Sequence, residues 1–168
     1  AKTYPGESTD VRNKLSYVAD LDENHRLIVM DSCVYSFDEP QKQHTGGEIS
    51  EEAMKWIKGI SDDANEKGKT LMMMLHHGLA AHMETEPSIT FAFPLDNYLE
   101  VAEQFASWGI HYAFSGHLHT DDTASVINDD GEVLYDFETA SITGYPCTYR
   151  EMTISTLENG ESEMEAQS

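Results

Sequence analysis

Apolar residues occur along the chain in short continuous runs and in longer stretches with helical spacing. Four short runs predict strands, at residues 15–19, 26–35, 70–75 and 110–114. Two longer stretches place apolar residues three and four positions apart and predict helices, at residues 50–68 and 96–109. The first 114 residues therefore predict an alternation of strands and helices, which is typical of an α/β fold.

Both predicted helices have recognisable ends. Ser50 is suited to cap the first helix, and Gly68 is suited to end it in a left-handed conformation. Asp96 is the corresponding N-cap of the second helix, which Gly109 closes. We expect Leu99 to face the core together with the other apolar residues of the second helix.

Beyond residue 120 the pattern changes to hairpins. Residues 123–127 and 132–137 flank an Asn-Asp-Asp-Gly turn, and residues 149–157 predict a last strand. The stretch 158–168 is acidic and holds no basic residue, so we expect a solvated, frayed tail. The whole order predicts an α/β core flanked by antiparallel strands, with ligands gathering at the carboxyl ends of the strands.

The charge of the chain narrows the choice of functions. The 168 residues include 10 basic and 31 acidic ones, a net charge of −21, which disfavours a nucleic-acid-binding surface or an anionic membrane as partner. From Thr70 onward the only basic residue is Arg150, so a phosphate handled there needs a metal ion. The longest aliphatic run, 71–75, is too short for a membrane span. Cys33 and Cys147 predict two buried thiols or, alternatively, one disulfide.

Histidines form the main candidate site. Six of the eight lie between residues 76 and 119, and His76 and His117 each follow a buried strand. In an extended segment residues i and i+2 point the same way, so His117 and His119 are expected to face one cavity while Leu118 faces the core. Such spacing suits two metal ions about 3.5–4 Å apart, with His76 as a third ligand.

These motifs resemble a known family. The apolar run 71–75 followed by His76-His77, and then the Gly116-His117-Leu118-His119 motif, resemble the C-terminal half of the calcineurin-like metallophosphoesterases. This family includes purple acid phosphatases and bacterial cyclic-nucleotide phosphodiesterases. The resemblance implies part of an αββα sandwich, with mixed sheets flanked by helices. Residues 1–157 would form the C-terminal portion of that domain, and 158–168 the acidic tail.

The resemblance also implies roles for individual residues. His76 and His117 would bind the second of two divalent ions (manganese, iron, zinc or similar), and His119 would bind the first. His77 and Gly116 would support these ligands without touching the metal. In the family the two ions bind phosphate oxygens and activate a hydroxide for attack on phosphorus. His82 is a candidate proton donor to the leaving group.

The family's N-terminal motifs, Asp-x-His, Gly-Asp and Gly-Asn-His, are absent, and Asn24-His25 is interpreted as a turn. We therefore expect an incomplete hydrolase of small phosphoesters, more suited to diesters than to monoesters. Alone it would bind one divalent ion weakly and have little activity. The expected partner is the missing N-terminal half of the same domain, as in a nicked chain, or a second copy of this chain.

Two other interpretations remain. One is a hydrolase of unrelated fold with a single zinc ion on the same three histidines. The other is a non-catalytic module that inherited the fold and lost the site. The sequence leaves the substrate, the metal and the compartment open, with bacterial extracytoplasmic and cytoplasmic locations both allowed.

Overall fold

The computed structural model describes residues 2–3, 15–34, 45–84 and 93–168. Two helices are present in these ranges, α1 (Glu51–Glu66) and α3 (Tyr98–Ser107). The strands are β1 (Lys2–Thr3), β2 (Tyr17–Asp20), β3 (His25–Val29), β4 (Thr70–Met74), β5 (Ile110–Ser115), β6 (Asp122–Ile127), β7 (Val133–Glu138), β8 (Glu151–Thr156) and β9 (Ser162–Gln167). Neither helix in the described part of the chain is long and apolar enough to cross a membrane.

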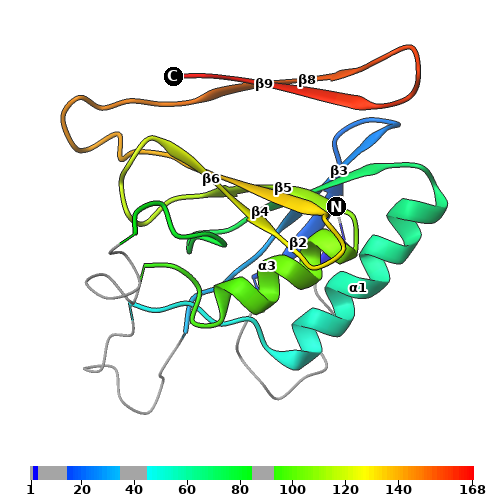
Figure 1. The fold of residues 1–168 in the computed structure, drawn as a ribbon, viewed down its shortest axis with the longest axis horizontal. Coiled ribbons are helices and arrows are strands. Elements are labelled where there is room, and N and C mark those ends of the chain that lie inside the picture. The colour runs from blue at the N-terminus through cyan, green and yellow to red at the C-terminus, as the bar shows by residue number, and fades with distance from the viewer. Residues whose placement is uncertain (1, 4–14, 35–44, 85–92) are drawn as a thin grey trace.

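Seven strands form one mixed sheet in the order β1-β2-β3-β4-β5-β7-β6. The central strands β3, β4, β5 and β7 are parallel, whereas the outer strands β2 and β6 pair antiparallel with their neighbours. Both helices cover one face of this sheet, and the β8–β9 hairpin lies over the other face (Figure 1). The structure confirms the predicted α/β class with a mixed sheet flanked by helices.

The hydrophobic core lies between the sheet and its helices. Strand β4 carries alternate residues to opposite faces, so Leu71 and Met73 join the core cluster that includes Ile57 of α1 and Phe105 of α3. Met72 points to the other face. There it lines a cavity of about 240 Å³ together with residues of β8 such as Met152. Parallel strands are buried on both sides, which explains the continuous apolar run 71–75.

The first helix has both predicted ends, whereas the second has only the predicted C-terminal end, where Gly109 follows the C-cap residue Trp108 with φ +85°. Ser50 Oγ accepts a hydrogen bond from the Ala53 amide at 3.2 Å, and Gly68 has φ +62°. Helix α3 begins one residue later than expected, with Asn97 at the N-cap position instead of Asp96. The reason is that the Asp96 amide donates to the carbonyl of Gly47, which holds Asp96 outside the helix. Leu99 is consequently 51% exposed, because Tyr98 takes the place against the core.

The acidic C-terminal stretch is ordered as a strand, so the expected frayed tail is wrong. Strand β9 pairs along its whole length with β8. Ser162 and Met164 are half-buried while Glu161, Glu163 and Glu165 beside them are exposed, an alternation that places the charges on the outer face. The Ser162 hydroxyl also lies 2.6 Å from Thr70 Oγ1 and 3.1 Å from His25 Nε2, which fastens the hairpin to the main sheet.

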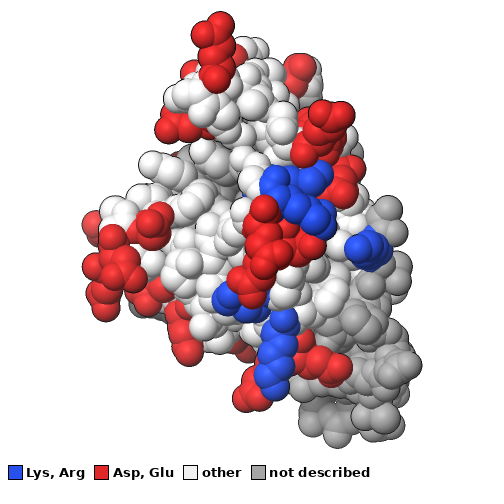
Figure 2. All heavy atoms as spheres, turned by 90° about the vertical axis from the view of Figure 1, so that its right-hand side faces the viewer, with Lys and Arg blue, Asp and Glu red and all other residues white. Residues whose placement is uncertain are grey.

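Two further features concern charge and cysteine. On the face that Figure 2 shows, Lys and Arg side chains lie directly beside Asp and Glu side chains. Neither cysteine forms a disulfide, so the alternative of one disulfide is wrong. Cys33 is half-buried and Cys147 is exposed, so the prediction of two buried thiols is wrong for Cys147. The Cys147 amide closes a turn by donating to the Gly144 carbonyl, and Cys147 has φ +60°.

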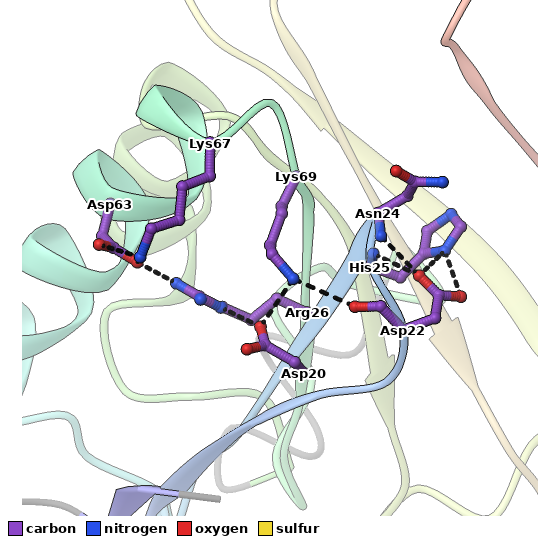
Figure 3. A network of polar contacts seen from close by, with 8 residues as sticks. All are labelled: Asp20, Asp22, Asn24, His25, Arg26, Asp63, Lys67 and Lys69. Carbon is purple, nitrogen blue, oxygen red and sulfur yellow. Dashed lines mark hydrogen bonds and ion pairs between the residues drawn. The ribbon is translucent and has the colours of Figure 1, made fainter.

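An ion-pair network joins the end of α1 to the β2–β3 hairpin (Figure 3). Arg26 donates from Nε to Asp20 at 2.7 Å and from Nη1 to Asp63 at 2.6 Å. Lys67 binds Asp63, and Lys69 lies 3.2 Å from Asp20. The hydrogen bonds from Arg26 lower the pKa of both aspartates to about 2.

Candidate metal centre

The predicted metal-binding histidines lie at one edge of the sheet. His76 and His77 follow β4, and His117 follows the neighbouring parallel strand β5. Backbone hydrogen bonds continue past the strand ends, from Leu75 to the Phe114 carbonyl at 3.0 Å and from Gly116 to the His76 carbonyl at 3.1 Å. The two histidine-bearing segments are therefore held side by side.

The rings of His76 and His117 face each other. His76 Nε2 lies 2.8 Å from His117 Nδ1, and the ring centroids are 4.4 Å apart. His117 Nε2 lies 3.0 Å from the Thr45 carbonyl oxygen, which only accepts, so the proton of the neutral ring is on Nε2. His117 Nδ1 consequently presents a lone pair toward His76. Burial, with smaller effects from His117 and His119, lowers the pKa of His76 and favours its neutral form.

The ring of His77 packs edge-on against the rings of His76 and His117. Its side chain is buried, with Nδ1 2.7 Å from the Ser32 hydroxyl and Nε2 3.0 Å from the Thr45 carbonyl oxygen. Burial lowers the pKa of His77 to about 4, so the ring is neutral near pH 7. Both ring nitrogens are engaged. Because the Thr45 carbonyl accepts from both His77 and His117, the position of one ring constrains the other.

The segment after β5 is bent rather than extended. His117 and His119 have φ +81° and +61°, and the Leu118 amide donates to the Gly116 carbonyl at 3.1 Å. The expected i, i+2 alternation is therefore wrong: Leu118 is half-buried and the His119 side chain is exposed. Left-handed backbone at residues other than glycine is strained and often marks functional segments. Gly116 does not supply the left-handed turn, because its φ lies outside that region.

His119 does not join the pair in one ligand group. In residues 2–3, 15–34, 45–84 and 93–168, no three His, Cys, Asp or Glu side chains converge as a metal site would require. The His119 amide instead donates to Glu138 Oε1 at 3.2 Å. The two rings of the pair share a hydrogen bond of 2.8 Å. Two nitrogens bound to one tetrahedral zinc ion at about 2.0–2.1 Å lie about 3.3 Å apart, so the rings would have to separate by roughly 0.5 Å to hold an ion.

Two buried carboxylates beneath the histidine segments were missed by the sequence reasoning. Asp136 and Glu138 of β7 are 0% and 1% exposed and share the helix-covered face of the sheet with Leu134. The Ser115 hydroxyl lies 2.7 Å from Asp136 Oδ1 and 3.0 Å from Glu138 Oε2. Burial raises the pKa of Glu138 to about 7. The Ser115 hydroxyl thus links the two acidic side chains.

His82, the predicted proton donor, lies beside this group. Its ring is 2% exposed, with Nδ1 3.1 Å from Asp122 Oδ2 and Nε2 3.6 Å from Asp136 Oδ2. Burial alone would lower the pKa of His82, but Asp136 and Asp122 outweigh it and raise the pKa. The ring can therefore carry a proton. Its enclosure keeps a leaving group away in this conformation, and the catalytic role stays a prediction.

Comparison with known proteins adds one finding on the fold. The sequence matches no protein-family model, and no curated protein matches it. The structure is similar to the crystal structure of a dimetal phosphatase from Danio rerio, with a TM-score of 0.53 and 12% sequence identity. The likeness covers 74% of this chain and 49% of that one, so the chain spans about half the length of that phosphatase. The predicted fold is thereby supported.

Proposed function

We propose that this chain is part of a metal-dependent phosphoester hydrolase, with His76 and His117 as ligands of one ion and His119 as a ligand of a second. The observation that carries the proposal is the 2.8 Å approach of His76 Nε2 to His117 Nδ1 at the carboxyl ends of two parallel strands. Ligand sites of α/β folds gather at this edge. The fold shared with a dimetal phosphatase is consistent with such an activity.

Two divalent ions, when bound, would polarise the phosphoryl oxygens and lower the pKa of a bound water. The chain's own residues orient the ligands. Thr45 fixes the tautomer of His117 by accepting the Nε2 proton, and His77 holds Thr45 in place. A hydrogen bond of this kind keeps a ligand ring in the orientation that its metal requires.

Arg150, the one basic residue after Thr70, is committed elsewhere. Its guanidinium binds Asp121, donates to the Asp122 carbonyl at 3.2 Å and stacks over Phe137. It is therefore not available as a clamp for phosphate. A diester carries one negative charge fewer than a monoester at neutral pH, so this environment favours a diester as substrate.

A complete dinuclear site needs more ligands than the described part of the chain brings together. Each ion takes about four to six ligands, and two histidine nitrogens converge here. We propose that another segment of the same enzyme, or a second copy of the chain, supplies the carboxylates. The apolar sheet face around Met74 and Phe114, which the β8–β9 hairpin covers incompletely, offers a surface for it.

Calorimetric titration of the purified chain with Co²⁺ tests the metal site. We expect weak binding of one ion by the wild type and at least a tenfold loss of affinity in His117→Ala. The control is His111→Ala, whose ring lies against the Val133 carbonyl at 2.7 Å and outside the pair. Equal affinity in the wild type and His117→Ala would refute the proposal, and one tightly bound zinc would favour a single-zinc site. Little diesterase activity is expected until the missing ligands are supplied.

A further inference from the structure

We propose that Asp136 is a positioning residue that sets the distance between His76 and His117. This inference rests on the proposed function, because it concerns the same metal ligands. Asp136 does not face the ligand pair. It acts through the segments after β4 and at the end of β5, which carry the two histidines. Its carboxylate accepts hydrogen bonds from both segments.

Asp136 connects the loop after β4 to the end of β5. Its Oδ2 accepts hydrogen bonds from the amides of Leu79, at 2.5 Å, and Ala80, at 3.2 Å. Its Oδ1 accepts from the Ser115 hydroxyl at 2.7 Å. Leu79 follows His76 by three residues, and Ser115 precedes His117 by two. One buried carboxylate thus fixes both segments close to their histidines.

The chemistry of this position requires a carboxylate. Two amides and one hydroxyl converge on its two oxygens, and His82 Nε2 lies 3.6 Å from Oδ2. An asparagine has one acceptor oxygen, and its NH₂ group would face either the amides or the hydroxyl. The loop also passes close by, since a Cβ at Gly78 would lie 3.4 Å from Asp136 Oδ2. Asp136 is fully buried, so a larger side chain would have to displace its neighbours.

Leu134→Ala is the control that distinguishes a positioning role of Asp136 from a general contribution of this strand to stability. Leu134 lies two residues before Asp136 on the same strand and the same face, and it is equally buried. It belongs to the hydrophobic core cluster. Leu134→Ala should destabilise the fold and leave the geometry of the histidine pair unchanged, whereas Asp136→Asn should change that geometry at constant side-chain volume.

The test uses two measurements on the purified chain. Long-range ¹H–¹⁵N NMR of the histidine rings, without metal, reports the Nδ1 and Nε2 states of His76 and His117. Titration with Co²⁺ reports their joint affinity. We expect Asp136→Asn to abolish the ring ¹⁵N chemical shifts that mark the hydrogen bond between His76 and His117. We also expect it to weaken Co²⁺ binding about 10–100-fold. Leu134→Ala should keep wild-type values in both measurements.

The outcomes distinguish this inference from the proposed function. Unchanged ring shifts and Co²⁺ affinity in Asp136→Asn, with binding lost in His117→Ala, would overturn the inference alone. Wild-type chain that does not bind Co²⁺, with ring shifts that still change in Asp136→Asn, would overturn the metal site and keep the positioning role. Should Asp136→Asn fail to fold, Ser115→Ala removes one of the same contacts and is expected to weaken Co²⁺ binding in the same direction.

Discussion

Gly47 offers the sharpest structural perturbation of the candidate site. A Cβ at this position would lie 2.4 Å from both Cγ and Nδ1 of His77, which is 1.0 Å closer than the 3.4 Å at which ordinary contact begins. The ring cannot move freely, because Ser32 and the Thr45 carbonyl hold its two nitrogens. Gly47→Ala therefore displaces either the backbone or a buried ring.

The expected cost follows from these contacts. Overpacking of a buried site costs about 1–3 kcal/mol, and each hydrogen bond lost by His77 adds about 0.5–1.5 kcal/mol. With both hydrogen bonds of His77 lost, we expect Gly47→Ala to lower the free energy of unfolding by about 2–6 kcal/mol. The same change should weaken Co²⁺ binding, because His77 shares the Thr45 carbonyl with His117.

Gly59 provides the matched control for urea unfolding. It lies inside α1, and a Cβ there would meet nothing within 4 Å. Gly59→Ala should stabilise the chain by about 0.5–1 kcal/mol, since alanine is the better helix former. If Gly47→Ala were as stable as Gly59→Ala and bound Co²⁺ like the wild type, the close packing of Gly47 on His77 would be wrong.

Two further predictions concern the ion-pair network and the C-terminal hairpin. The pKa values of Asp20 and Asp63 are lowered from 3.8 to about 2, so their stabilising effect is complete above about pH 4 and is lost as the pH falls toward 2. Arg26→Met should flatten this dependence between about pH 4 and pH 2 in urea unfolding, and an unchanged slope would contradict the network. Ser162→Ala removes contacts with Thr70 and His25, so hydrogen exchange should quicken in β8 and β9 and stay unchanged in β4. Equal protection in both proteins would show that apolar packing alone holds the hairpin.

Local patterns predicted the sheet and both helices because their signals lie within a few residues. The buried run 71–75, the Ser50 cap and the Gly68 terminus each depend on neighbours in sequence. The start of α3 was missed because the Asp96 amide bonds to Gly47, almost fifty residues away. The strand β9 was not predicted because the glutamates of residues 158–168 indicated a solvated tail. The alternation of Ser162 and Met164 with these glutamates is the pattern of a strand.

The candidate site was predicted in part for a similar reason. His76 and His117 were placed at one edge because parallel strands align their carboxyl ends. The bend at His117 depends on contacts from residues elsewhere in the chain, among them the Glu138 carboxylate that binds the next segment. Asp136 and Glu138 did carry a signal, since acidic residues on the inward positions of a strand are unusual unless they have partners. The identity of those partners requires the tertiary structure.

The most direct test of the account is a crystal of the chain soaked in zinc and measured at the zinc absorption edge. The account predicts one anomalous peak bound by His76 Nε2 and His117 Nδ1, at about 2.0–2.1 Å from each nitrogen. A crystal with zinc at other positions and none between these two rings would contradict it.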